Sequence, residues 1–142
     1  SKPGFISTRR IDRGLRIILL PDYRWARKDI KLTQLLYPVL AKNHAQEVGY
    51  DDAWFMQDGL VTEGTTNNAG IIVSDRFITH SVDQDILAGT ARVTLIEAAS
   101  FLGLKVEERS IMLDEIDQAE EAFVTSSMNI IVPFTQIDGA LI

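Results

Sequence analysis

The stretch Val61-Thr62-Glu63-Gly64-Thr65-Thr66-Asn67-Asn68-Ala69 lies between two apolar segments and is the most informative part of the chain. It combines one carboxylate, one glycine and a series of short hydrogen-bonding side chains. Small polar residues in a row between two strands ordinarily form a surface loop. The same composition also suits a backbone that passes close to a ligand, because glycine leaves room and short polar groups can bond to it. We therefore expect a loop here, with a binding role as the alternative to a plain connection.

Apolar spacing on either side of this loop predicts one mixed α/β or α+β domain. Short apolar or alternating runs predict strands at 15–20, 53–56, 69–73, 76–79, 105–109, 122–125 and 130–137. Apolar residues at helical spacing predict helices at 33–48, 91–102 and 113–119. Turns are expected at Asp58-Gly59, Ser74-Asp75 and Asp138-Gly139, and helix stops at Gly49 and Gly103.

The composition of the 142 residues excludes several classes of protein. The chain has no cysteine, so it has no disulfide scaffold, zinc ribbon or thiol nucleophile. A formal net charge of −6 argues against a general nucleic-acid or anionic-membrane binder. The apolar run Ile17–Leu20, closed by Pro21, is too short to span a bilayer. No charged region followed by a long apolar run opens the sequence, so we do not expect a signal peptide. These features are typical of a cytoplasmic domain.

Metal-dependent and serine hydrolysis are both disfavoured. The chain has two histidines, His44 on the polar side of the first predicted helix and His80 after a strand, and we expect ordinary surface or strand-end roles for both. Without cysteine they make a poor transition-metal site, and no metal is assigned, although carboxylates could still bind Mg²⁺ or Ca²⁺. The chain contains no G-x-S-x-G motif for a nucleophilic serine.

Lys31 ends a cationic segment, Arg24-Trp25-Ala26-Arg27-Lys28-Asp29-Ile30-Lys31, just before the first apolar helix. A lysine at such a place is most often a solvated surface residue. The functional alternative is that an amine near other cations and apolar walls forms a Schiff base with a carbonyl compound.

Two segments are candidate anion-binding sites. Gly89-Thr90 opens the helix 91–102, where free N–H groups and the positive end of the helix dipole attract a phosphate. Thr125-Ser126-Ser127 follows a strand and offers hydroxyl groups. Each is also ordinary capping or turn chemistry. A lysine, a carboxylate and two phosphate sites together match what pyridoxal phosphate requires.

Four motifs in order carry a resemblance to a known family: 29–31 (DIK), 61–68 (VTEGTTNN), 86–92 (ILAGTAR) and 123–127 (FVTSS). The chain resembles the class IV, fold-type IV pyridoxal-phosphate aminotransferases from about Leu15 to Ile142, and is most similar to their D-amino acid (D-alanine) branch. The resemblance implies an α+β fold, with a mixed barrel-like sheet and helices packed outside. It also implies that residues 1–142 are the large, C-terminal, cofactor-binding domain and that the family's small N-terminal domain lies outside this chain.

The resemblance assigns a role to each matching residue. Lys31 matches the Schiff-base lysine, which also moves the proton between the substrate and the cofactor. Glu63 matches the partner of the pyridine nitrogen, and Leu87 the residue against the ring face. The phosphate sites are Thr90, Ala91, Ser126 and Ser127, while Arg24 and Trp25 are expected to support the lysine segment.

The chain departs from the family pattern at two positions. Ala91 stands where a threonine is usual, so a phosphate hydroxyl contact is missing. Asn129 stands where glutamate is frequent, and no physical reason is evident.

The implied reaction is transamination between an amino acid, with D-alanine as the first candidate, and a 2-oxo acid, in a cytoplasmic homodimer. Branched-chain aminotransfer, amine transamination and the aminodeoxychorismate lyase reaction are alternatives within the family. A cofactor-binding chain without turnover is the alternative from another class.

Overall fold

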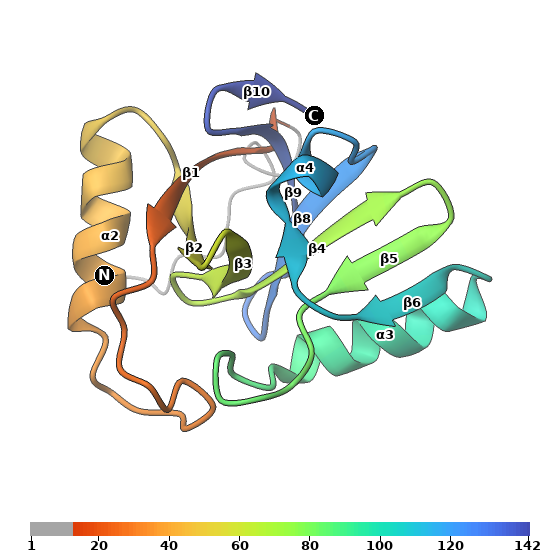
Figure 1. The fold of residues 1–142 in the computed structure, drawn as a ribbon, viewed down its shortest axis with the longest axis horizontal. Helices are drawn as coiled ribbons and strands as arrows, with labels where there is room; N and C mark the ends of the chain where they lie inside the picture. The colour runs from red at the N-terminus through yellow and green to blue at the C-terminus, as the bar shows by residue number, and fades with distance from the viewer. Residues whose placement is uncertain (1–12) are drawn as a thin grey trace.

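The computed structural model describes residues 13–142, and its centre is a ten-stranded mixed sheet (Figure 1). Nine strands follow the order β6-β5-β4-β8-β9-β1-β2-β3-β7, and β10 pairs with β9. Neighbours are antiparallel except for the pairs β1–β2, β1–β9 and β5–β6, which are parallel. The strands are β1 (Leu15–Pro21), β2 (Asp52–Gln57), β3 (Leu60–Gly64), β4 (Asn68–Val73), β5 (Arg76–Thr79), β6 (Lys105–Glu108), β7 (Ile111–Met112), β8 (Glu121–Ser126), β9 (Ile130–Ile137) and β10 (Ala140–Leu141).

The two long helices lie outside the curled sheet, at its two sides (Figure 1). Helix α2 (Leu36–Glu47) packs on β1 and β2, and α3 (Thr90–Phe101) packs on β6 and β8. The short α4 (Leu113–Ile116) directly follows β7. This arrangement confirms the expected α+β fold with a barrel-like sheet.

The main core lies within the curl of the sheet, because alternate strand residues point to the same face. Leu15 and Ile17 of β1 are buried with Trp54 of β2, whose ring lies 5.1 Å from that of Phe134 between centroids. A second cluster under α3 contains Phe77, Phe123 and Ala99. The sheet is therefore stabilised on both sides.

The predicted turns are confirmed at Asp58-Gly59, Ser74-Asp75 and Asp138-Gly139, where Asp58, Ser74 and Asp138 have positive φ. All seven predicted strands are also confirmed, each to within one residue at either end. The loop predicted over 61–69 is wrong in its first half, because β3 pairs with β2 through Val61 and Gly64. Valine and threonine favour a strand, but the polar residues around them concealed it.

The first helix begins at Leu36 rather than at residue 33. Pro38 has no N–H group and fits only the first turn of a helix, so a start at residue 33 would place it in the interior. The third helix ends at Ile116 rather than at residue 119. The chain then continues as a turn, with hydrogen bonds between residues three positions apart, such as Ala119 N–H to Ile116 O.

The two histidines differ in burial. His44 is exposed on α2, whereas His80 is buried after β5 and contacts the carbonyl of Ser81 and the hydroxyl of Ser110. The surface expectation is therefore wrong for His80, and its strand-end position is confirmed. Within residues 13–142, every helix is too short or too polar to cross a lipid bilayer.

Candidate active site

A cleft of about 520 Å³ opens where four segments of the chain converge. One side is formed by the β1–α2 connection and the start of α2, within residues 23–40. The other side is formed by residues 63–68 after β3, by Leu87 and Gly89 before α3, and by residues 125–127 at the end of β8. The cleft thus gathers all the motifs that the sequence analysis singled out.

Glu63 is the buried carboxylate of the cleft, at the end of β3. Its Oε2 accepts hydrogen bonds from Asn68 Nδ2 (3.0 Å) and from the backbone N–H of Leu87 (3.2 Å), and its Oε1 accepts one from Arg24. Burial raises the pKa of Glu63 to about 7, although the charge and hydrogen bond of Arg24 oppose the shift. The negative charge of the carboxylate is therefore only partly compensated, and a further cation or N–H donor would stabilise its charged form.

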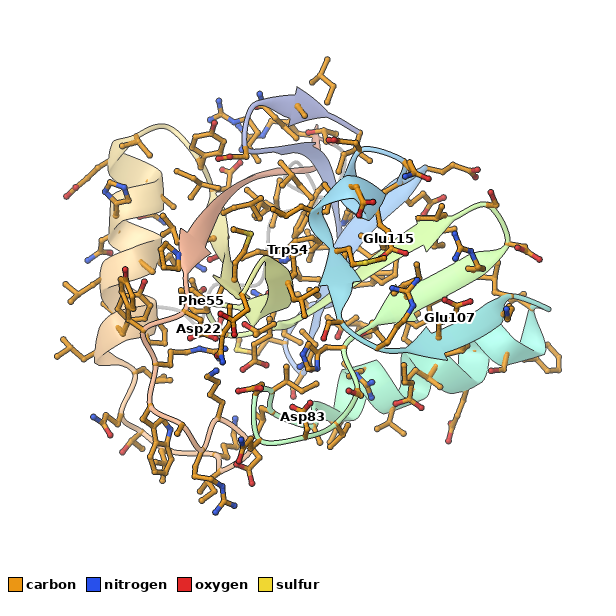
Figure 2. The ribbon with its side chains drawn as sticks, viewed as in Figure 1. Asp22, Trp54, Phe55, Asp83, Glu107 and Glu115 are labelled. Atoms are coloured by element: carbon orange, nitrogen blue, oxygen red, sulfur yellow. The ribbon has the colours of Figure 1, made fainter. Side chains whose placement is uncertain are left out.

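Arg24 connects Glu63 to a second buried carboxylate, Asp22. Asp22 accepts bonds from Arg24 Nε (2.8 Å) and NH2 (2.6 Å) and from the Thr62 hydroxyl (2.8 Å). Arg24 also lies over the Phe55 ring, 4.7 Å from its centroid, and Asp22 and Phe55 are labelled next to each other in Figure 2.

The ionised forms of this pair are favoured. Burial alone would raise the pKa of Asp22, but the hydrogen bond and charge of Arg24 hold it below its ordinary value. Burial likewise opposes the charge of Arg24, yet Asp22 and Glu63 raise its pKa above the usual value.

Two lysines line the cleft, and their surroundings differ. Lys31 is exposed, and none of the residues at 13–142 forms a hydrogen bond or ion pair with it. Lys28 is only 7% exposed, and its Nζ donates to Gln57 Oε1 and to Asp85 Oδ1, both at 2.9 Å. The amine of Lys31 is therefore the one left free to react.

The end of β8 contributes hydroxyl groups to the cleft. Thr125, Ser126 and Ser127 all line it. The Thr125 hydroxyl is buried and has no hydrogen-bond partner in the part of the chain that the structure describes. The Ser127 hydroxyl lies 3.4 Å from that of Thr90. A cluster of hydroxyl groups with unused bonding capacity suits an anion.

Gly89 brings the start of α3 close to Asn68. It is the N-cap of α3, where no side chain caps the first N–H groups. A Cβ atom at Gly89 would lie 2.2 Å from Asn68 Oδ1, so a larger residue cannot occupy this position without displacing Asn68. At the start of α3, backbone atoms rather than a side chain therefore border the cleft.

The structure brings most of the predicted site residues together. Five of the predicted site residues line the cleft: Lys31, Glu63, Leu87, Ser126 and Ser127. Thr90 and Ala91 are in the first turn of α3 and are not among the lining residues, although Thr90 is next to Ser127. The roles assigned to these residues stay predictions.

Sequence reasoning missed or misplaced four contributors. Arg24, expected to support the lysine segment, bonds directly to Glu63. Asn68 is in sequence only the last residue of the VTEGTTNN motif, yet it joins Glu63 to the carbonyl of Leu87. Asp22 and Lys28 are not marked by any local pattern, because Thr62, which bonds to Asp22, and Gln57 and Asp85, which bond to Lys28, are distant in sequence.

A family model described as amino-transferase class IV matches residues 7–137. The chain belongs to the class IV aminotransferases. A D-alanine aminotransferase of Bacillus licheniformis is 40% identical over 129 residues, which are 91% of this chain and 46% of that protein. This class IV chain thus spans about half the length of the curated relatives it matches.

Solved structures of class IV aminotransferases confirm the fold. A branched-chain aminotransferase of Thermoproteus uzoniensis with norvaline superposes with a TM-score of 0.82 at 30% identity, covering 92% of this chain and 46% of that one. The PLP form of a branched-chain amino acid aminotransferase from Thermobaculum terrenum gives a TM-score of 0.78 at 29% identity, covering 91% and 45%. Class IV aminotransferases use pyridoxal phosphate.

Proposed function

We propose that this chain is the pyridoxal-phosphate-binding large domain of an aminotransferase that exchanges an amino group between an amino acid and a 2-oxo acid. The observation that carries the proposal is the convergence of Lys31, Glu63 and the Ser126-Ser127 turn on one cleft in a class IV chain. D-alanine is the first candidate amino donor, because the curated relatives at 30–40% identity are D-alanine aminotransferases.

The residues of the cleft fit this cofactor. Glu63 is a buried carboxylate whose charge is only partly compensated, which suits a protonated ring nitrogen. The partnerless Thr125 hydroxyl, Ser126 and Ser127 offer donors for a phosphate, and the uncapped start of α3 offers backbone N–H groups there. The phosphate site has no threonine hydroxyl at Ala91, so this proposal relies on those other donors.

When bound, pyridoxal phosphate acts as an electron sink for the substrate α-carbon. In this proposal, Glu63 holds a proton at the ring nitrogen, and Arg24 and Asn68 keep its carboxylate oriented. Leu87 lines the cleft and packs against the ring, while the Nζ of Lys31 takes a proton from the α-carbon and later returns one.

The region around the cleft mouth supports a role within a larger assembly. Exposed large hydrophobic side chains gather there, at Tyr23, Trp25, Leu32, Leu35 and Leu36. An apolar surface of this kind is a contact surface rather than a solvent face. We propose that another domain of the whole protein, or a second copy in a homodimer, covers it.

A branched-chain amino acid is the second candidate substrate. The Thermoproteus uzoniensis structure is a branched-chain aminotransferase crystallised with norvaline, and it shares 30% identity with this chain. Assays of the whole protein with D-alanine or L-leucine and 2-oxoglutarate separate the two, since each donor produces a different 2-oxo acid.

Borohydride reduction in the presence of pyridoxal phosphate tests the proposal. We expect the 142-residue chain to form a borohydride-stable pyridoxyl adduct, and peptide mapping to place it on Lys31. Lys31→Ala should abolish the adduct and lower turnover of the whole protein by about 10³-fold or more. The thermal midpoint should change little, because Lys31 is exposed.

Lys105→Arg is the matched control, because this exposed lysine lies outside the cleft and should contribute no adduct. An adduct on Lys28, or none in the folded wild type and whole protein, would overturn the proposal. A cofactor adduct without turnover in the whole protein would instead leave a binding role.

A further inference from the structure

Lys28 occupies an unusual position for a lysine. It is buried, and its Nζ lies within 3.3 Å of three side chains from separate segments. These are Asp22 Oδ2 at 3.3 Å, Gln57 Oε1 at 2.9 Å and Asp85 Oδ1 at 2.9 Å. A buried ammonium needs such partners, because desolvation of a lone charge is costly. The amine of Lys28 is therefore held in a buried network of polar side chains and does not form an ordinary surface ion pair.

Lys28 joins the two sides of the cleft. Within the described residues, both hydrogen bonds between the 22–35 segment and the 80–89 loop belong to this residue: Nζ to Asp85, and the backbone N–H to the carbonyl of Gln84 at 2.9 Å. Figure 1 shows the orange β1–α2 connection beside the green β5–α3 loop at this point. The first segment carries Lys31, and the second carries Leu87.

The same lysine completes a line of alternating charges that ends at the carboxylate of the cleft. The order is Asp85, Lys28, Asp22, Arg24 and Glu63, and each neighbouring pair is in ion-pair contact. Asp22 is the shared acceptor, with no exposed side-chain surface. Removing the Lys28 charge leaves Asp22 still paired with Arg24, while the 30% exposed side chain of Asp85 can turn to water. Removing this charge therefore weakens mainly the contact between the two segments.

We propose that Lys28 is a positioning residue that ties the Lys31 segment to the Leu87 loop and so sets the width of the cleft. The inference rests on the proposed function only in naming what the cleft holds. Lys28 is distinct in role from Lys31, because its amine is occupied on three sides.

Hydrogen exchange of the 142-residue chain tests the tether directly, without cofactor. In Lys28→Met, which keeps an unbranched side chain but removes the charge, amide exchange in 22–31 and 81–89 should accelerate about tenfold or more. Exchange in β8 and β9 should stay unchanged. Arg27→Met is the matched control, because Arg27 forms an exposed pair with Asp29 in the same segment. Asp85→Asn, a milder change, should accelerate the same two segments to a smaller extent.

A cofactor readout separates positioning from plain stabilisation. At a temperature where all variants are folded, Lys28→Met should weaken pyridoxal phosphate binding about tenfold or more, and Lys28→Arg should restore part of it. Arg27→Met should bind like the wild type. A purely stabilising lysine would lower the thermal midpoint without changing this affinity.

The hydrogen-exchange and cofactor-binding experiments can fail independently of each other. Unchanged exchange at 22–31 and 81–89 in folded Lys28→Met and Asp85→Asn overturns the tether, whatever the cofactor result. If the wild type forms no adduct while exchange accelerates as expected, the proposed function fails and the tether stands. Accelerated exchange with unaltered cofactor affinity would show that Lys28 joins the segments without positioning the site, which contradicts the inference.

Discussion

The two sides of the cleft are built in opposite ways. The inner wall is formed by Glu63, Asn68, Leu87 and Gly89, and hydrogen bonds join the first three to one another. The outer wall, formed within residues 23–36, presents exposed apolar side chains and the free amine of Lys31. Preorganised polar groups need neighbours that fix them, whereas an apolar surface needs a cover. The difference fits the proposed function, in which the polar inner wall holds the cofactor and the apolar outer wall contacts another domain or subunit.

The two tryptophans give the largest expected contrast between the regions. Trp54 is fully buried beside the inner wall, and Trp25 of the outer wall is 45% exposed. Trp54→Ala should lower the free energy of unfolding by about 3–5 kcal/mol, because it leaves a large cavity. Trp25→Ala should lower it by about 1 kcal/mol or less. Urea unfolding of both variants measures the difference, and equal losses would show that the outer wall is packed within this chain.

The pH dependence of stability isolates the inner wall. Burial raises the pKa of Glu63 from 4.5 to about 7, so the folded state holds this proton more tightly than the unfolded state. Its stabilising contribution is therefore complete below about pH 4.5 and is lost as the pH rises to about 7, by about 3 kcal/mol.

The Glu63→Gln variant, which does not titrate, makes that contribution measurable. The difference in unfolding free energy between wild type and Glu63→Gln should decrease by that amount between pH 4.5 and 7. Glu47→Gln, at an exposed position on α2, serves as the comparison. Parallel curves for wild type and Glu63→Gln would contradict the buried state of this carboxylate.

A smaller effect is expected at the junction of the inner wall with α3. In Gly89→Ala, the added Cβ displaces Asn68, which loses its bonds to Glu63 and Leu87. We expect a loss of about 1–3 kcal/mol in the free energy of unfolding and weaker pyridoxal phosphate binding. Ala88→Ser, at the exposed neighbouring position, should change stability by about 0.5 kcal/mol or less. A Gly89→Ala variant with unchanged stability and unchanged pyridoxal phosphate binding would show that the close approach to Asn68 is not required.

Local patterns in the sequence were enough to predict most helices and strands and most of the predicted residues that line the cleft. The turn pairs, the strands around Trp54 and Phe123, and both long helices follow from spacing that involves near neighbours only. The exceptions have local causes that composition hides. Pro38 delays the start of α2, and the polar residues around Val61 conceal β3. The motifs around Lys31, Glu63 and Ser126 converge on one cleft, as the resemblance implies.

The sequence by itself determined the family, the α+β fold and the residue types available for chemistry. Only the tertiary structure decided which of two neighbouring lysines is free of partners. It also decided that Arg24 bonds to Glu63 as well as to Asp22, which pairs with Lys28 of the lysine segment. The physical reason is that burial, and the partners a charge meets there, depend on contacts between residues far apart in the chain. Lys28 and Asp85 are 57 positions apart, and only the folded sheet brings them to 2.9 Å.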